Sequence, residues 1–154
     1  MPKHLTANSK MNKKLDFSSL RNVISSLQDA LGIVADEKWF SSQNQRIQNT
    51  LMAGVVQNFV FVYELSIKML RRQLELEADS PESIDHASYR DMLRTAAEKC
   101  LITDVEKWFD YRYLRNLTSH TYDIEKAKQV YAQTLVFIDD AVKLLQRLES
   151  RSDA

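Results

Sequence analysis

Glycine and proline are scarce in this chain, and this scarcity is the strongest constraint on its fold. Only two residues of each type occur among 154 residues, whereas an average chain contains about 7% glycine and about 5% proline. Tight turns depend on these residue types, so a turn-rich β architecture is disfavoured. Long helices with short links need few of them, and the length suits one domain with its own core. We therefore expect a single all-α domain.

The charge balance and the single cysteine limit the classes of function. The formal net charge is zero, from 21 basic and 21 acidic residues, so a general electrostatic coat for nucleic acid is disfavoured and only a local site is allowed. Cys100 cannot form an internal disulfide, and we expect it to be a small buried core residue rather than a nucleophile. No apolar run approaches the roughly 18 residues of a membrane span, and no signal-peptide pattern begins the chain. These features predict a cytoplasmic protein without membrane insertion.

Hydrophobic periodicity predicts one helical domain over residues 16–150, after a flexible polar tail over residues 1–15. A first helix is expected to begin at Ser18 or Ser19, either of which can cap it. Gly32 is the expected end of this helix, with the alternative that Ile33 and Val34 extend its packing.

The longest periodic segment covers about residues 41–77 and predicts a second helix. Asp79-Ser80-Pro81 is expected to end it, and proline suits a first turn that follows. The segment includes the run Val60-Phe61-Val62-Tyr63. Such a run makes the helix apolar on more than one side, and one side then needs cover outside the core. A second copy of the chain is the simplest source of that cover.

Capping patterns predict three more helices. Ser88 with Asp91 starts a third helix, Thr103 with Glu106 forms a capping box for a fourth, and Asp123 caps a fifth. The apolar residues of the fifth helix recur at the spacing of a bundle seam: Tyr131, Leu135, Ile138, Val142 and Leu145. The expected architecture is an antiparallel up-and-down bundle of four to five helices.

The segment RNLTSHTY, residues 115–122, holds the side chains best suited to chemistry. Arg115 offers a planar fork of donors for phosphate, and His120 can give or take a proton near neutral pH. Asn116 and His120 share a helix face because they lie four residues apart. Arg115 and His120 lie five apart, so they converge only if the helix ends near Thr118 or a second chain supplies the other half. Phosphodiester chemistry or nucleotide binding follows as the predicted function.

A structural interpretation of the same motif stays open, in which a histidine at a helix end binds a backbone carbonyl. The remaining histidines, His4 and His86, are expected to be solvated, and with Cys100 they lack metal-ligand spacing. Glu64 is expected to form a stabilising i, i+4 pair on its own helix. A solvated helix face, rather than a phosphate site, is expected for the basic run Lys68, Arg71 and Arg72.

The RNLTSHTY segment resembles the arginine–four residues–histidine–X–tyrosine signature of HEPN domains. The segment VQNFVFVYELSIK, residues 56–68, is similar to the long second helix of one HEPN subfamily, the nucleotidyltransferase substrate-binding proteins. The resemblance covers about residues 18–148. It implies an antiparallel helical bundle that forms a homodimer with its two motifs facing each other. It also implies a partner, because these proteins accompany minimal nucleotidyltransferases in two-gene modules.

The same resemblance implies a role for each motif residue. His120 would be the general acid–base of a metal-independent endoribonuclease that needs no cofactor, and Arg115 would stabilise charge in the transition state. Asn116 would orient the imidazole or bind phosphate, and Ser119 would help to bind nucleotide or RNA. In such modules the HEPN protein is the toxin, and the nucleotidyltransferase silences it by transferring AMP to the motif tyrosine, here Tyr122.

Three functions remain open at this point. The first is a dimeric ribonuclease toxin silenced by its nucleotidyltransferase. The second is a non-catalytic subunit that binds nucleotide or substrate for that transferase. The third is a purely structural helical dimer in which the motif is incidental.

Overall fold

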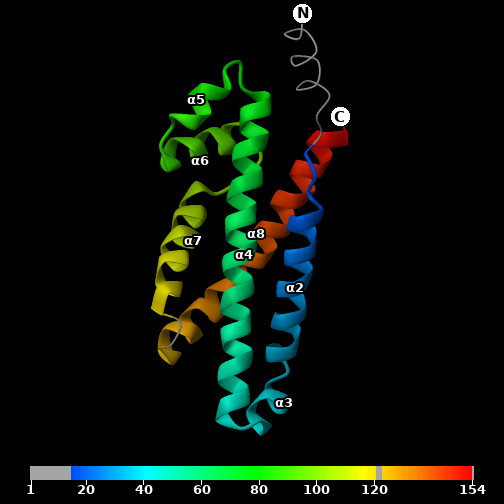
Figure 1. Ribbon diagram of the computed structural model, residues 1–154, viewed down its shortest axis with the longest axis vertical. Helices are drawn as coiled ribbons and strands as arrows, with labels where there is room; N and C mark the ends of the chain where they lie inside the picture. The colour runs from blue at the N-terminus through cyan, green and yellow to red at the C-terminus, as the bar shows by residue number, and fades with distance from the viewer. Residues whose placement is uncertain (1–14, 121–122, 154) are drawn as a thin grey trace, which may run out of the picture.

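The computed structural model describes residues 15–120 and 123–153, and for His120 and Asp153 it describes the backbone alone. These residues are helical and contain no strand, which confirms the predicted all-α class (Figure 1). The expected tail over residues 1–15 lies almost wholly outside them. The elements, in chain order, are α2 (Ser18–Ala35), α3 (Glu37–Ser42), α4 (Gln45–Glu77), α5 (Pro81–Asp85), α6 (Tyr89–Glu98), α7 (Val105–Leu117), the 3-10 turn η1 (Thr118–His120) and α8 (Ile124–Asp153).

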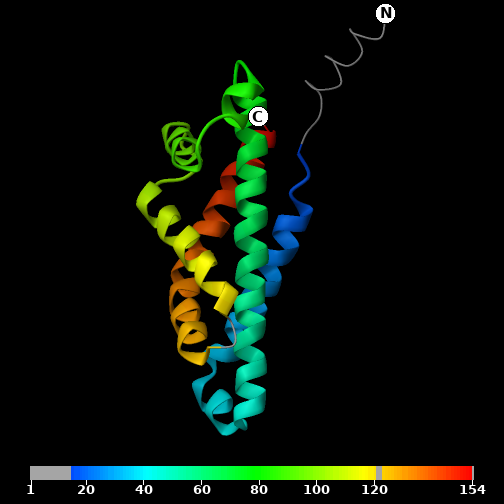
Figure 2. The same ribbon diagram turned by 60° about the vertical axis from the view of Figure 1, so that its left-hand side comes forward.

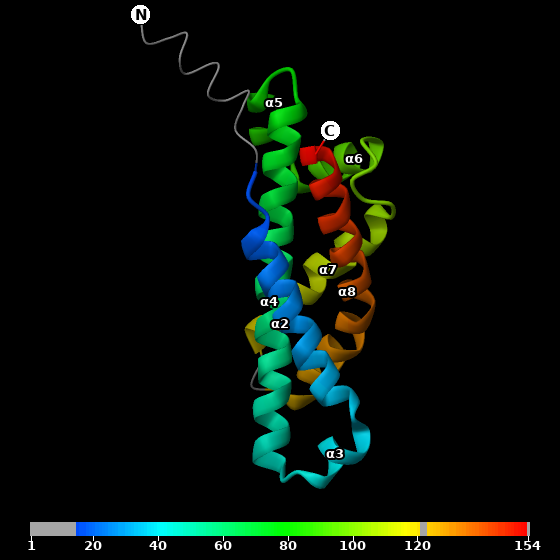
Figure 3. The ribbon, with the colours of Figure 1, turned by 90° about the vertical axis from the view of Figure 1, so that its right-hand side faces the viewer.

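The long helix α4 is the central column of the molecule. α2 and α8 both pack along it and also contact each other, whereas α6 and α7 lie on the side away from α2 (Figure 2). In the perpendicular view α2 passes across α4, and α3 turns the chain at the lower end (Figure 3). The long helices α2, α4, α7 and α8 alternate in direction, so the structure confirms the antiparallel bundle.

Three helix starts that the sequence predicts are confirmed. Ser88 Oγ accepts a hydrogen bond from the backbone N–H of Asp91 at 3.1 Å at the start of α6. Asp123 Oδ1 accepts one from the N–H of Glu125 at 3.0 Å at the start of α8. Pro81 occupies the first turn of α5, where its missing N–H costs nothing.

The predicted serine cap of the first helix is wrong. Neither Ser18 nor Ser19 caps α2, because Phe17 takes the N-cap position and makes no side-chain cap. Phe17 is only 5% exposed, so burial of its ring sets the start of the helix and leaves both serines in the first turn. The carboxylate of Asp16 accepts from the Ser18 N–H at 2.9 Å instead.

The described residues show no capping box at the start of the fourth helix, and the cap lies one residue later than predicted. Asp104, and not Thr103, is the N-cap of α7, and its Oδ1 accepts from the N–H groups of Glu106 and Lys107 at 3.0 and 3.4 Å. A carboxylate at a helix N-terminus also interacts favourably with the helix dipole, which favours aspartate over threonine at this position.

The link between the first two long helices also differs from the prediction. α2 continues past Gly32 because Val34 is buried and extends the packing stripe. The short helix α3 then follows, and α4 begins later than expected. Its start is set by Asn44, whose Oδ1 accepts from the N–H of Ile47 at 3.0 Å.

Aromatic rings from three helices form the centre of the core. Phe137 of α8 packs edge-on against Phe59 of α4, with ring centroids 5.0 Å apart. It packs in the same way against Tyr111 and Trp108 of α7, at 4.9 and 6.0 Å. Edge-to-face contacts are favoured because the positive ring edge meets the negative ring face. This cluster fixes α7 against α4 and α8.

The predicted seam of the last helix is partly confirmed, because Ile138 and Leu145 are buried, but the centre of the buried face lies beside it. Leu135 belongs to the predicted stripe but is 43% exposed. One residue rotates a helix face by about 100°, so two neighbouring stripes have similar spacing but different directions. The true stripe includes the polar Thr134 and the small Ala141, which conceal it when only large apolar residues are counted. Its buried members are Val130, Thr134, Phe137, Ala141, Leu144 and Leu148.

α4 is apolar on more than one side, as its sequence predicts. Val62 and Tyr63 are buried, but Phe61 is 45% exposed. By length and a mean hydropathy of 1.4 in its most apolar window, α4 is also long and apolar enough to cross a membrane, which the sequence reasoning did not anticipate. The core helix of a soluble protein passes the same test, and eleven residues of α4 are buried against the rest of the bundle.

Cys100 is exposed, so its predicted place in the core is wrong. It follows the end of α6 with a left-handed backbone, φ 63°. The N–H of Leu101 donates to the carbonyl of Ala96 at 2.9 Å, and the N–H of Cys100 donates to that of Ala97 at 3.0 Å. These two bonds form a Schellman motif that satisfies the last carbonyls of α6. Cys100 is therefore exposed because its backbone ends α6, and its side chain is not part of the core.

Candidate functional site

Three hydrogen bonds hold the guanidinium of Arg115 in the last turn of α7. Its Nε and Nη2 donate to Glu64 Oε1 at 3.1 and 2.8 Å, and its Nη1 donates to Thr118 Oγ1 at 2.8 Å. Thr118 Oγ1 donates in turn to the Arg115 carbonyl at 2.6 Å. A guanidinium has five N–H groups, so two are unused among the described residues. The Arg115 side chain is 33% exposed, so part of it reaches solvent.

Glu64 is a site residue whose partner the sequence reasoning assigned wrongly. Its i, i+4 spacing predicts a pair with Lys68 on the same helix, but in the structure Glu64 binds Arg115 across the α4–α7 contact. The signal that points to Glu64 is its position in the segment VQNFVFVYELSIK, which carries part of the family resemblance. The helical spacing rule favours local partners and gives no information on a helix that arrives later in the chain.

The helix that carries Arg115 ends where the motif requires it to end. α7 stops at Leu117, Thr118 is its C-cap, and the 3-10 turn follows, which confirms the predicted end near Thr118. This turn packs against α7 and α8. This end of the α-helix is the condition that the sequence sets for Arg115 and His120 to face one site. The His120 side chain and all of Tyr122 lie outside the described residues.

Asn116 takes no part in the hydrogen bonds that hold the Arg115 guanidinium in the described part of the chain. Asn116 is exposed and lines a groove beside α7, and among the described residues no hydrogen bond occupies its carboxamide. Ser119 is also exposed, and its Oγ donates to the Asn116 carbonyl at 2.8 Å. The close partners of Arg115 are thus Glu64 and Thr118, rather than the two polar neighbours in the motif.

A groove of about 320 Å³, the α6–α7 groove, lies between α6 and α7. The guanidinium carbon of Arg90 lies 4.4 Å from the ring centroid of Phe109, and that of Arg112 lies 4.3 Å from that of Tyr89. The sequence reasoning missed this groove because its residues come from two helices. The available signal was the neighbouring pair Tyr89-Arg90 in one helix and the run Tyr111-Arg112-Tyr113 in the other. The lining residues are Tyr89, Arg90, Phe109, Arg112, Tyr113 and Asn116.

Two tyrosine hydroxyls connect the α6–α7 groove to the Arg115 site. The hydroxyl oxygens of Tyr63, on α4, and Tyr89, on α6, lie 2.7 Å apart. Burial raises the pKa of Tyr63, although its hydrogen bond with Tyr89 and the cations Arg112 and Arg115 act in the opposite direction. Burial also raises the pKa of Tyr89, and its hydrogen bond with Tyr63 raises it further. Both hydroxyls are therefore neutral at physiological pH and act as hydrogen-bonding groups.

The other groups that the sequence singles out form no site in the described part of the chain. His86 is exposed at the end of α5, as expected, and His4 lies outside the described residues. Lys68 and Arg72 are exposed and Arg71 is half-buried, with no ion pair to any described residue. Within the described ranges no three His, Cys, Asp or Glu side chains are grouped as metal ligands.

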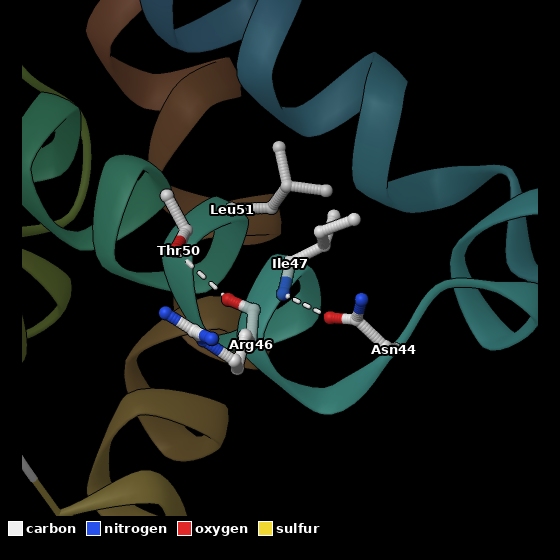
Figure 4. A pocket seen from close by; sticks show the side chains of 5 residues that line it. All are labelled: Asn44, Arg46, Ile47, Thr50 and Leu51. Atoms are coloured by element: carbon white, nitrogen blue, oxygen red, sulfur yellow. Dashed lines mark hydrogen bonds between the residues drawn. The ribbon is translucent and has the colours of Figure 1, made fainter.

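A second hollow, of about 360 Å³, lies at the start of α4 (Figure 4). Its polar side chains mainly serve the helix itself. Asn44 Oδ1 accepts from the N–H of Ile47 at 3.0 Å, and Thr50 Oγ1 donates to the carbonyl of Arg46 at 2.8 Å. The Arg46 guanidinium alone remains, and one surface arginine does not make a catalytic site.

Known proteins resemble this chain over nearly its whole length. Residues 15–150 match the family described as nucleotidyltransferase substrate binding protein like. A Haemophilus influenzae protein named probable ribonuclease HepT is 43% identical over 142 residues, which are 92% of this chain and 97% of that protein. A solved Haemophilus influenzae structure, described as revealing the fold of a substrate binding domain of a nucleotidyltransferase, matches with a TM-score of 0.85 and 42% identity, over 87% of this chain and 99% of that one. The chain therefore belongs to the nucleotidyltransferase substrate-binding protein-like family of HEPN proteins.

Proposed function

We propose that this chain is the HEPN toxin of a cytoplasmic two-gene toxin–antitoxin module and acts as a metal-independent endoribonuclease. The observation that carries the proposal is the geometry of Arg115. Glu64 and Thr118 fix its guanidinium at the end of α7, and two N–H groups remain for a phosphate. The 43% identity to a protein named probable ribonuclease supports the same activity.

The proposed reaction moves the phosphoryl bond from the 5′-oxygen of one nucleotide to the 2′-oxygen of its neighbour. A base takes the proton of the 2′-hydroxyl, the 2′-oxygen attacks phosphorus, and the bond to the 5′-oxygen breaks as an acid protonates it. The products are a 2′,3′-cyclic phosphate and a free 5′-hydroxyl. His120 supplies one proton transfer, and Arg115 stabilises the negative charge on the five-coordinate phosphorus. Asn116 and Ser119 bind or orient the RNA beside them.

A homodimer would supply the second proton-transfer group, since each chain has one motif histidine. Phe61 is 45% exposed on α4, three residues before Glu64, and so on the same helix face as the partner of Arg115. A second copy that covers Phe61 would bring its own motif close to this Arg115. The dimer would therefore bury an apolar side chain and complete the proposed active site in one step.

The proposed antitoxin is the cognate minimal nucleotidyltransferase. It would transfer AMP from ATP to the hydroxyl of Tyr122 with release of pyrophosphate. The phosphate of the attached AMP carries a negative charge that Arg115 can bind, so the modified chain would exclude RNA from the site. The matching family and the solved relative are both described by reference to a nucleotidyltransferase, which supports this partner.

The ribonuclease proposal is tested with single-stranded RNA and purified protein in the presence of a chelator. Arg115→Ala and His120→Ala should each lower the cleavage rate by at least about 100-fold. The matched control is Arg94→Ala, which removes an exposed arginine that pairs with Asp91 and with no other described residue, and it should leave the rate unchanged. A 2′-deoxyribose at the cleavage position should block the reaction. Equal rates for all three variants, or cleavage of the 2′-deoxy substrate, would overturn the proposal.

The modification is tested by intact mass after coexpression with the nucleotidyltransferase. A gain in adenylate units is expected for the natural chain, and Tyr122→Phe should abolish it. Tyr113→Phe is the matched control, because Tyr113 is a second tyrosine with an accessible side chain. It is 62% exposed. An adenylate gain that persists in Tyr122→Phe would place the modification elsewhere.

A second candidate is a non-catalytic subunit that binds nucleotide for the transferase. The ion pair with Glu64 favours it, because the carboxylate neutralises part of the charge that a ribonuclease would direct at phosphate. The formal net charge of zero also offers little general attraction for RNA. Calorimetry separates the two candidates: nucleotide binding that depends on Arg115, in a protein that cuts no RNA, would favour the binding subunit.

A further inference from the structure

We propose that the α6–α7 groove binds a single-stranded RNA segment next to the Arg115 site, with Arg90 and Arg112 on its phosphates and Tyr113 against a base. This inference rests on the proposed function and extends it, because it assigns a substrate-binding surface outside the motif. It concerns residues that the motif does not include, apart from Asn116 at the border between the two sites.

The first observation is the charge of the groove. Two of its six lining residues are arginines, and none is acidic. The guanidinium groups of Arg90 and Arg112 form no ion pair or hydrogen bond with any described residue. By contrast, Arg94, which lies one helical turn after Arg90, pairs with Asp91. The groove is therefore a local concentration of available positive charge on a chain whose net charge is zero.

The second observation is that aromatic rings hold both guanidinium groups in place. Arg90 lies over Phe109 at 4.4 Å and Arg112 over Tyr89 at 4.3 Å. A ring supports the flat face of a guanidinium and leaves the N–H groups at its edge free. Tyr89 is itself fixed by its hydroxyl contact with Tyr63. Two phosphate-binding forks are thus oriented before any ligand arrives, which lowers the entropy cost of binding.

The third observation is an accessible aromatic surface in the same groove. The side chain of Tyr113 is 62% exposed although its neighbours Arg112 and Asn116 line the groove with it. Nucleic-acid bases stack on such rings in proteins that bind single strands, and the arginines then follow the backbone. A paired duplex hides its base faces, so this combination favours an unpaired RNA segment.

The fourth observation is continuity with the proposed catalytic site. Arg112 and Asn116 lie four residues apart on one face of α7, and Arg115 lies between them in sequence. The positive charges of both Arg112 and Arg115 act on the same hydroxyl, that of Tyr63. A strand bound in the groove would therefore continue toward Arg115, with Asn116 at the junction.

The test uses the full chain and a short fluorescent RNA in which every 2′-hydroxyl is methylated, so that it binds without being cut. Arg90→Gln and Arg112→Gln should each weaken binding about 5- to 10-fold and lower the slope of log affinity against log salt by about 0.7. Tyr113→Ala should weaken binding at least about 5-fold. Arg112→Lys keeps the positive charge but lacks the planar fork of N–H donors. The slope of log affinity against log salt should therefore match that of the natural chain. Arg94→Gln is the matched control and should bind as the natural chain does.

The results of these binding measurements decide whether the α6–α7 groove binds RNA. If Arg90→Gln, Arg112→Gln and Tyr113→Ala all bind RNA like the control, the inference is overturned, even where RNA cleavage itself is observed. If they keep RNA affinity but lose modification of Tyr122 by the nucleotidyltransferase, the groove is a protein-docking surface and the inference fails. If no RNA is cut but affinity still depends on Arg90 and Arg112, the groove stands and the ribonuclease proposal fails. Where Arg112→Gln does not fold, Arg90→Gln alone decides.

Discussion

Glu64 and Arg115 join α4 to α7 through one carboxylate oxygen, which lies 2.8 Å from Nη2 and 3.1 Å from Nε of the arginine. The two residues are 51 positions apart in sequence. The contact has two opposing effects on a phosphate that approaches Arg115. It orients the guanidinium, which favours binding, and it neutralises part of the charge, which disfavours binding.

Two substitutions of Glu64 separate these effects. Glu64→Gln keeps an oxygen acceptor for Arg115 but removes the negative charge, so affinity for uncleavable single-stranded RNA should rise about 2- to 5-fold, which corresponds to about 0.5–1 kcal/mol for an exposed ion pair. Glu64→Ala removes the acceptor as well, so the single-turnover cleavage rate should fall about 10-fold as Arg115 loses its orientation. Fluorescence anisotropy and single-turnover cleavage measure the two quantities.

The matched control is Glu125→Gln, which removes an exposed carboxylate of α8 that pairs with Lys128 at 3.8 Å. It should change neither affinity nor rate. RNA affinity for Glu64→Gln at or below that of the control would contradict the proposed neutralisation of Arg115.

Tyr111 should make the bundle less stable in alkaline solution. Burial raises its pKa, and the hydrogen bond that it donates to Asp140 raises it further. In the unfolded chain a tyrosine ionises near pH 10, while the folded protein keeps Tyr111 protonated at that pH. Its contribution to the free energy of unfolding is therefore constant below about pH 9 and falls above about pH 10, by up to about 1.4 kcal/mol per pH unit.

Urea unfolding between pH 8 and about pH 11.5 tests this expectation. Tyr111→Phe should be about 1 kcal/mol less stable at pH 8, because it leaves Asp140 without its donor, and this deficit should shrink as the pH rises above about 10. Tyr113→Phe, at a position that is 62% exposed, is the control and should keep the natural slope. A deficit for Tyr111→Phe that stays constant across this pH range would be inconsistent with the raised pKa.

Cys100 occupies a backbone conformation that suits glycine better. A side chain in the left-handed region costs about 1–2 kcal/mol, and glycine avoids this cost but loses about 0.5–1 kcal/mol through its freer unfolded chain. Cys100→Gly should therefore raise the free energy of unfolding by about 0.5–1 kcal/mol. Cys100→Ala keeps the Cβ and should give no gain. Thermal melting of both variants is the measurement, and equal melting temperatures would argue against strain at φ 63°.

Removal of two buried hydroxyls in the core should change the free energy of unfolding in opposite directions. Ser66 is fully buried on α4, and its Oγ has no hydrogen-bond partner among the described residues. Ser66→Ala should raise the free energy of unfolding by about 1 kcal/mol, because it removes an unsatisfied polar group. Thr134 is equally buried but donates to the carbonyl of Val130 at 2.6 Å. Thr134→Val should lower the same free energy by up to about 1 kcal/mol.

Chemical denaturation of these two variants gives the comparison directly. A loss of stability in Ser66→Ala similar to that in Thr134→Val would mean that the Ser66 hydroxyl does make a favourable interaction in solution.

The features that could be predicted from the sequence are local ones. The scarcity of glycine and proline, together with hydrophobic periodicity, is sufficient for the all-α class and for the five longer helices. Ser88, Pro81 and Asp123 mark helix starts correctly because each acts on backbone groups within one turn of itself. The end of α7 near Thr118 and the membership of the HEPN family also follow from short segments.

The features that depended on the tertiary structure involve a choice between local and distant partners. Glu64 had a suitable partner on its own helix, and only the packing of α7 against α4 brought Arg115 closer. Packing also decided which part of the apolar face of α8 lies deepest in the core, because the rings of Phe59 and Tyr111 surround Phe137. The α6–α7 groove exists only because two helices lie side by side.

Local interactions along the chain thus determined where helices form and which motif they carry. Packing between helices decided which side chain each charge meets, because that depends on the rotation of every helix about its axis. A change of one residue in the buried stripe turns a face by about 100°, and the sequence of a single helix does not contain that information. For this reason the tertiary structure determines the pairing of Arg115 with Glu64, and it also determines that the neighbouring Arg90 and Arg112 pair with no described residue.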